Sequence, residues 1–384
     1  MPYAFEEHAA PGRPPLYEYR PLIRSFVGAR SGRLARSDDA LLALDELRRE
    51  PAAAVFARVH SGTEATEEEA LMRTVLLPLL VRTAERCGGF DWDDAAFDGA
   101  YVELEQAMFG GRRTYAALAP LLGLSSGLET QLGGGIRVRP AVPGELAANW
   151  PEASGLLPAD FGREPDRMCV LELEQALPPR AVDLPDAPGE LGDAVTVLRL
   201  ATAAPVSAGP VLFERLDWRP LGIRPMLPIA ATQPPGEPSK LDRFRAALAR
   251  SLLERISAAD ADPELAEALD LWELALFQGD PSRSEQLRSA LGAVLGSGEG
   301  LWAAALRAAL LLGQTPRERA EAMTRLRALA RGDRADAATT DLIRRTFVEV
   351  LLQTDRERLI RDLDGAALGL RPRPAIAPIA RVAS

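Results

Sequence analysis

The spacing of apolar residues predicts helices over most of this chain. In the first third, apolar positions recur every three or four residues in segments that open with a polar capping residue. Ser37 is such a cap for a helix that stops at Pro51, and Thr66 with Glu69 forms a capping box for a longer apolar segment. We expect that second helix to kink at Pro78, because proline lacks the backbone donor.

A different pattern, of short apolar segments bounded by glycine and proline, predicts strands in the middle of the chain. Gly133 to Gly135 precede the alternating segment Ile136 to Pro140, which is typical of a strand entered through a tight turn. The prolines of 223–230 limit that segment to the edge of a sheet. Further strands are predicted at 168–174 and 211–218, with a short helix at 191–200.

Beyond the proline-rich linker at 233–239, every periodic segment predicts a helix. The predicted helices begin at Lys240, Pro263, Pro281, Leu301, Pro316, Asp341 and just after Thr354. Short connections between them indicate a helical bundle. The segment 301–312 is almost wholly apolar, so we expect it to be the central, most buried helix.

Together these patterns predict a mainly α fold with a small α+β middle region. The predicted parts are a flexible N-terminal arm at 1–16, a helical N-terminal region at 17–120, an α+β region at 121–232, a helical bundle at 240–365 and a proline-rich, unpacked tail at 366–384.

Composition narrows the classes of function. The formal net charge of −10 excludes a chain-wide basic surface for nucleic acid, and no apolar run reaches the roughly 18 residues of a membrane span, so we expect a cytoplasmic protein without a membrane partner. Two cysteines and two histidines are too few for a zinc site of the usual spacing, and no cofactor motif is present. We therefore predict no metal and no cofactor.

One acidic cluster and one glycine cluster have a functional and a structural interpretation. The aspartates between Asp91 and Asp98 could hold a cation, but they lack the glycine and distal glutamate of a calcium loop and fit capping of the helix that follows. Gly133 to Gly135 lack the GxxxxGK[ST] pattern of a phosphate-binding loop, which favours a turn.

The C-terminal helices resemble those of Apea-like HEPN domains. The resemblance is carried by the pattern WxxALRxxLLLG at 302–313, by TPRER at 315–319 and by DLIRRTFVEVLL at 341–352, and it covers about residues 240–360. It implies a HEPN-like helical bundle that often pairs into homodimers. Active members of the family share an arginine, four intervening residues and a histidine at the start of the last long helix, where the pair would cleave RNA without a metal.

This nuclease pair is missing here. Arg334 fits the arginine, but the fifth residue after it is Thr339, which cannot transfer a proton near neutral pH. Arg331 is followed at that distance by Asp336, and neither histidine of the chain has an arginine five residues before it. The resemblance therefore implies a degenerate pseudo-nuclease, and no catalytic residue is predicted.

Arginines around the expected loop leave several hypotheses open. Arg327, Arg331 and Arg334 are candidate phosphate or RNA contacts, although arginines interleaved with glutamates are also typical of a solvated helix face. The first hypothesis is a catalytically inactive HEPN-like module that binds an unidentified protein partner in a structural or regulatory role, in a setting of bacterial stress or defence. The second is an RNA-binding protein or RNase that uses the loop around Arg334. The third is an oligomeric scaffold, paired as a homodimer through the bundle.

Overall fold

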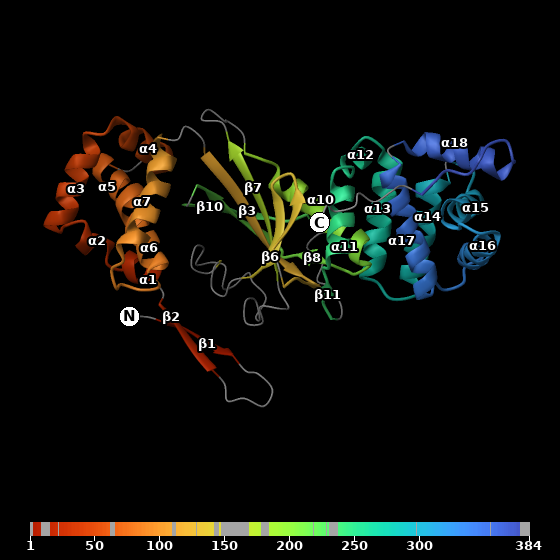
Figure 1. The fold of residues 1–384 in the computed structure, drawn as a ribbon, viewed down its shortest axis with the longest axis horizontal. Helices are drawn as coiled ribbons and strands as arrows, with labels where there is room; N and C mark the ends of the chain where they lie inside the picture. Colours follow the sequence, from red (N-terminus) through yellow and green to blue (C-terminus); the bar gives the residue numbers. More distant parts are fainter. Residues whose placement is uncertain are drawn as a thin grey trace.

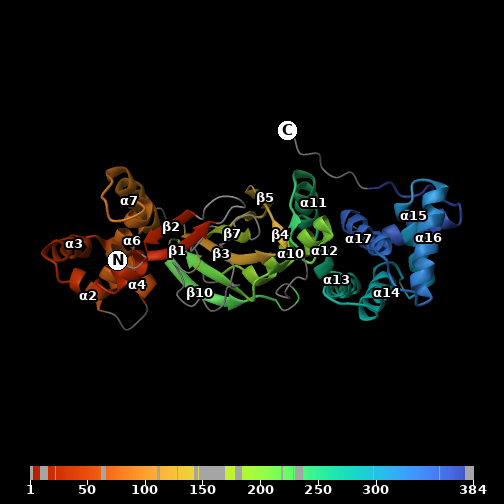
Figure 2. The same ribbon diagram turned by 90° about the horizontal axis from the view of Figure 1, so that it is seen from below.

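The computed structural model describes residues 3–8, 16–21, 23–61, 66–109, 113–127, 129–141, 146, 169–177, 184–217, 219–227, 229, 237–296, 298–353 and 355–376. Three parts follow one another in a row: helices at the N-terminal end, an antiparallel sheet in the middle, and helices at the C-terminal end (Figure 1; Figure 2). The fold is mainly α with a small β region, as the sequence predicts.

The N-terminal helices enclose a core of their own around Leu44, Leu71, Val75 and Leu104. They are α1 (Ile23–Gly28), α2 (Ser31–Leu34), α3 (Asp38–Arg48), α4 (Pro51–Ser61), α5 (Glu67–Leu71), the π-helical turn η1 (Met72–Leu76), α6 (Leu77–Arg86) and α7 (Asp94–Phe109). Large apolar side chains meet here at helical spacing, which is the pattern that predicted these helices.

Local signals in this part act as expected. Ser37 accepts the backbone N–H of Ala40, and Thr66 and Glu69 form the predicted capping box. The irregularity expected at Pro78 takes the form of η1, which lies directly before it, because proline has no amide to continue the regular α-helical hydrogen bonding.

Strands occur at both ends of the first 120 residues. Within the arm predicted at 1–16, β1 (Tyr3–His8) is extended and pairs in antiparallel fashion with β2 (Leu16–Pro21). The prediction that residues 17–120 form a helical region is wrong at its end. The expected helical region ends in β3 (Arg113–Leu122), the central strand of the main sheet. β3 carries apolar residues on both faces because both faces are buried, so its sequence lacks the alternation that marks a half-exposed strand.

The main sheet follows the strand order β10, β9, β3, β7, β6, β5, with β8 (Ser207–Ala208) pairing with β3. The strands are β5 (Thr130–Gly133), β6 (Ile136–Pro140), β7 (Cys169–Leu177), β9 (Val211–Leu216) and β10 (Arg219–Pro225). β10 lies at the edge, as its prolines require. At the tight turn before β6, Gly135 has a φ of +81°, and a Cβ there would lie 2.2 Å from the carbonyl oxygen of Glu174.

Helix α10 (Ala187–Thr202) and the C-terminal helices share one continuous core with one face of the sheet. The linker predicted at 233–239 lies mostly outside the described residues; β11 (Ser239–Lys240) at its end pairs in parallel with β4 (Leu124–Ser125). The C-terminal helices are α11 (Arg243–Leu253), α12 (Ser257–Asp260), α13 (Pro263–Leu276), α14 (Ser282–Leu295), α15 (Leu301–Leu312), α16 (Pro316–Ala330), α17 (Ala337–Leu352) and α18 (Arg356–Ala367).

The central helix of this part is α17, so the prediction that α15 is the central helix is wrong, although more than half of the residues of α15 are buried. Helix α17 packs against α10, α11, α14, α15, α16 and α18. Trp302 and Leu306 of α15 lie one turn apart on an exposed face, because an apolar sequence does not by itself guarantee a neighbour on every side. The tail is also more packed than expected, since Arg373 donates to the carbonyl of Leu310 at 3.2 Å.

Candidate functional site

The loop between α16 and α17, where the sequence places the site, is used to cap a helix. Asp336 is the N-cap of α17 and accepts the backbone N–H of Thr339 at 2.7 Å and its hydroxyl at 2.6 Å. Arg325 adds an ion pair with Asp336 at 2.6 Å. Thr339, the fifth residue after Arg334, is a buried part of this cap.

Helix α14 holds the same loop from the other side. Ser284 accepts the backbone N–H of Ala335 at 2.9 Å, and Arg283 donates to the hydroxyl of Thr340 at 2.9 Å. The hydrogen bonds from Thr339 lower the pKa of the Asp336 carboxyl, with a further contribution from the charge of Arg325. Asp336 therefore stays ionised near neutral pH and is occupied as the acceptor of the cap, and the Thr339 hydroxyl is too weak an acid or base to transfer a proton there.

The three candidate arginines, Arg327, Arg331 and Arg334, are all exposed. Arg327 lies over the indole ring of Trp302, with 4.6 Å between the guanidinium carbon and the ring centroid. Within the described part of the chain, the side chains of Arg331 and Arg334 make no hydrogen bond or ion pair. We call Trp302, Arg327, Arg331 and Arg334 together the Trp302 surface.

Trp302 is the member of this surface that the sequence prediction missed. It is 48% exposed, although it opens the most apolar helix of the chain. Its i, i+4 relation to Leu306 was the available signal, because both fall on the side of α15 opposite the buried Ala304 and Ala308.

The segment 315–352 has fewer free positive charges than its number of arginines suggests. Several of its arginines are paired with acidic side chains: Arg317 with Glu321, Arg325 with Asp336, and Arg344 with Asp341. The interpretation as a solvated helix face fits Arg317 and Arg325, whose side chains are exposed, whereas Arg344 is largely buried and also donates to the carbonyl of Leu200.

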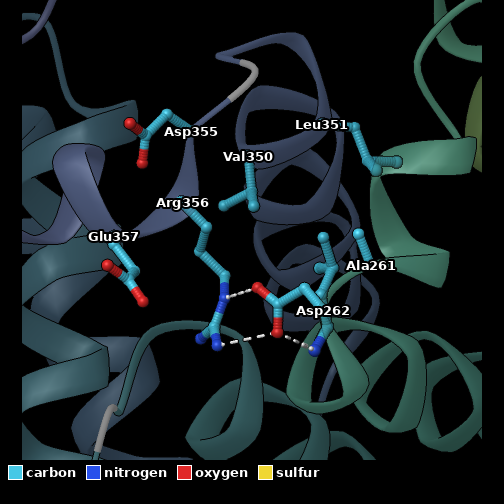
Figure 3. Close-up of a pocket in the computed structure, with 8 residues that line it drawn as sticks. Ala261, Asp262, Val350, Leu351, Asp355, Arg356 and Glu357 are labelled. Atoms are coloured by element: carbon cyan, nitrogen blue, oxygen red, sulfur yellow. Dashed lines mark hydrogen bonds and ion pairs between the residues drawn. The ribbon is translucent and has the colours of Figure 1, made fainter.

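A second candidate site is a pocket of about 200 Å³ where the start of α13 and the end of α17 meet the start of α18 (Figure 3). At its centre Arg356 faces Asp262, and the carboxylate of Asp355 lies apart from that pair (Figure 3). Arg356 is largely buried, and two of its nitrogens bond to Asp262 at 2.6 and 3.1 Å.

The charged groups of this pocket are already occupied by protein. Besides Asp262, Arg356 donates to Glu264 at 2.6 Å and to the carbonyls of Ala293 and Val294 at 3.2 and 3.3 Å, so all five of its N–H groups have acceptors. Asp355 caps α18 by accepting the N–H of Arg358. The pocket therefore joins the ends of α13, α14 and α18, and has no free cation for a substrate.

We expect Arg356→Met to lower the free energy of unfolding by about 2–3 kcal/mol. This is less than for a fully buried pair, because Asp262 is partly exposed. Burial raises the pKa of Asp262, but the hydrogen bonds from Arg356 and from the N–H of Leu265 outweigh it, so the folded-state pKa lies below its ordinary value of 3.8. The stabilisation is thus present above about pH 4 and is lost as the pH falls further.

Urea unfolding at pH 7 and pH 3 measures this effect. Arg358→Met is the matched control, because that arginine lies on the same helix and is exposed, so its replacement should change stability by less than about 0.5 kcal/mol. Equal losses for the two variants at pH 7 would contradict the assignment of Arg356 as a helix-joining residue.

Metal-binding side chains, membrane-spanning helices and known relatives give no further indication of function. Among the described residues, no group of three or more His, Cys, Asp or Glu side chains could hold a metal ion. Of the aspartates after Gly89, Asp93 caps α7 by accepting the N–H of Ala96 at 2.8 Å, and Asp94 accepts the indole N–H of Trp92 at 2.7 Å. No helix in the described ranges combines the length and apolar character needed to cross a bilayer.

Comparisons with protein-family models, curated proteins and solved structures give no match to this chain.

Proposed function

We propose that this chain is a catalytically inactive, HEPN-like binding protein with a structural or regulatory role toward a protein partner. The supporting observation is the state of Thr339. It stands where the resembling family has its catalytic histidine, and its hydroxyl donates to Asp336 in the cap of α17. A threonine that completes a helix cap stabilises the fold, and its hydroxyl is too weak an acid to transfer a proton near neutral pH.

The rest of the C-terminal part supports the same conclusion. Both histidines of the chain, His8 and His60, precede the sheet in sequence, so none belongs to the C-terminal helices. The order of α15, α16 and α17 matches the segments that carry the HEPN resemblance. A setting of bacterial stress or defence and pairing of two copies through the C-terminal helices follow from that resemblance alone.

RNA binding without cleavage is a second candidate, favoured by the Trp302 surface. Single-stranded nucleic acid is bound by exposed aromatic rings that stack on bases and by cations that contact phosphates. Trp302 and Arg327 would supply the stacking platform, and Arg331 and Arg334 have no acidic partner among the described residues to compete with phosphate.

One set of samples tests both candidates. We expect no RNA cleavage above background for the wild type, and no change in Arg334→Ala, because the loop offers no acid or base. RNA binding is followed by fluorescence anisotropy at two salt concentrations, for the wild type, for Arg331→Ala/Arg334→Ala and for the control Arg317→Ala, which removes an exposed arginine already paired with Glu321.

The outcomes separate the hypotheses. Binding that weakens roughly tenfold between about 50 and 200 mM salt, and that only the double variant loses, establishes the RNA-binding candidate. Absence of binding supports the protein-partner proposal. Cleavage that Arg334→Ala abolishes would refute both. Light scattering on the same samples gives the molecular mass and so tests pairing into a homodimer.

A further inference from the structure

The N-terminal helices enclose a cavity of about 280 Å³ that is separate from the C-terminal site. One wall is a single face of α6, formed by Leu80, Thr83, Ala84 and Cys87, which follow one another at spacings of three and four residues. Phe26 and its neighbours at the end of α1 form the opposite wall, and the segment after α6 closes the side. We call this space the α6 cavity.

The mouth of the α6 cavity is aromatic and exposed. Phe26 and Phe90 contact each other with ring centroids 5.0 Å apart, and Phe90, Trp92 and Leu80 each expose more than two fifths of their surface. Large apolar side chains gathered around a cavity are typical of a ligand-binding site.

A polar group inside the wall is left without a partner. Thr83 is only 3% exposed, and its hydroxyl makes no hydrogen bond. A buried hydroxyl without a partner is unfavourable, and native proteins keep few of them. Because Thr83 lines the α6 cavity, a rotation about χ1 that turned this hydroxyl toward the cavity would give it a ligand as its partner.

The charges at the cavity do not select an ion. Among the described residues that line it, one is a cation, Arg30, whose guanidinium stacks on Phe26 at 3.7 Å, and one is an anion, Asp91. Both are exposed at the rim, where their opposite charges offset each other, and the remaining wall is apolar apart from Thr83 and the Cys87 thiol. This combination fits an uncharged molecule.

We propose that the α6 cavity binds a small, uncharged, largely apolar molecule that carries one hydrogen-bonding group. The volume is slightly below that of typical drug-sized pockets, which sets the size. The apolar walls supply the affinity, and Thr83 supplies the polar contact.

N-phenyl-1-naphthylamine is a suitable probe, because it is uncharged, aromatic and carries one N–H. Its fluorescence should rise to saturation at one molecule per chain. The sulfonated analogue 8-anilinonaphthalene-1-sulfonate has the same rings and a negative charge, and should bind more weakly. Ala84→Leu, which fills the cavity, should weaken binding of the uncharged probe at least tenfold, and Thr83→Val about threefold. Phe244→Ala removes an exposed ring on α11 and should change nothing.

Cys87 provides a readout that needs no mutation. Cys87 lies partly exposed at the cavity. Cys169 is fully buried in the sheet, and burial raises the pKa of its thiol to about 11. A thiol reagent such as dithionitrobenzoate should therefore titrate one cysteine per folded chain. The bound probe should slow this reaction at least fivefold. If both thiols of Ala84→Leu react, that variant is unfolded and its probe binding is not interpretable. The proposal is then tested by the weaker binding of Thr83→Val and by the protection of Cys87 in the wild type.

Three results would overturn the proposal. They are failure of the uncharged probe to bind or to protect Cys87, equal binding by folded Ala84→Leu, and tighter binding of the sulfonate than of the uncharged probe.

Discussion

Arg199→Met should lower the free energy of unfolding by about 3–5 kcal/mol, the largest loss we expect from one substitution. Arg199 on α10 is completely buried and forms an ion pair of 3.0 Å with the buried Glu273 of α13. Methionine preserves much of the volume but leaves the Glu273 carboxylate without its counter-charge, and an uncompensated buried charge costs more than the pair itself contributes.

The same arginine holds two chain segments by its other nitrogens. It donates to the carbonyls of Val206 at 2.6 Å and Ile229 at 2.8 Å, and its guanidinium lies 4.8 Å from the ring of Phe277. These contacts place α10, the strand that follows it and α13 around one cation. Its loss should therefore weaken the contact between the sheet and the C-terminal helices as a unit.

A double-mutant cycle isolates the charge effect. Arg199→Met/Glu273→Leu removes both charges, and should be less destabilised than the sum of the single variants by at least about 1 kcal/mol. The exposed pair Arg361 and Glu357 on α18 is the matched control, and its removal should cost less than about 1 kcal/mol. Urea unfolding at pH 7 measures all of these. Additive losses at the buried pair would show that packing, and not charge, is responsible.

The pH dependence of Arg199→Met has a definite sign. Burial already raises the pKa of Glu273 above its ordinary value of 4.5, against the attraction of Arg199. Without Arg199 the folded-state pKa rises further, so the folded variant holds a proton that the unfolded chain releases. The destabilisation relative to wild type therefore grows as the pH rises above the raised folded-state pKa of Glu273 in the wild type, and is smallest at acid pH, where Glu273 is protonated in both proteins.

The helices were predictable where local chemistry alone defines them. α15 begins and ends where its sequence predicts, and Thr315 and Glu318 form the capping box expected before α16. α17 begins four residues earlier than predicted, because its first turn, from Ala337, contains alanine and threonine instead of the large apolar residues that mark a core face. Thr339 is buried all the same, since a tertiary contact covers it.

Features that depend on distant parts of the chain could not be predicted. β3 was taken as the end of a helical region, since an alanine-rich, doubly buried strand has no periodicity that distinguishes it from a helix. At the candidate site, the exposed arginines followed from composition. The stacking of Arg327 on Trp302 did not, because it depends on how α16 packs on α15.

Glu172→Gln should lower the free energy of unfolding by about 2–3 kcal/mol. Glu172 on β7 is 1% exposed and lies among three arginines, two on the neighbouring strand β6 and one on β9, which lies beyond β3. Its shortest ion pairs are 3.0 Å to Arg137, 2.7 Å to Arg139 and 3.2 Å to Arg215. Glutamine keeps the shape and removes the charge, so three neighbouring cations lose the carboxylate that they share, at a site largely shielded from solvent.

Glu174→Gln is the control, because Glu174 lies two residues along the same strand and approaches two of the same arginines at 3.7 and 3.8 Å, but is 46% exposed. It should cost less than about 1 kcal/mol. Burial raises the pKa of Glu172, but the hydrogen bonds from Arg137 and Arg139 outweigh it, so the folded-state pKa lies below its ordinary value of 4.5. The contribution of Glu172 is therefore present above about pH 4.5 and decreases as the pH falls below it. Urea unfolding at pH 7 and pH 3 should show that the difference in unfolding free energy between wild type and Glu172→Gln is smaller at pH 3. If Glu172→Gln and Glu174→Gln lower the unfolding free energy equally at pH 7, the arginines are stabilised by solvent and not by the buried carboxylate.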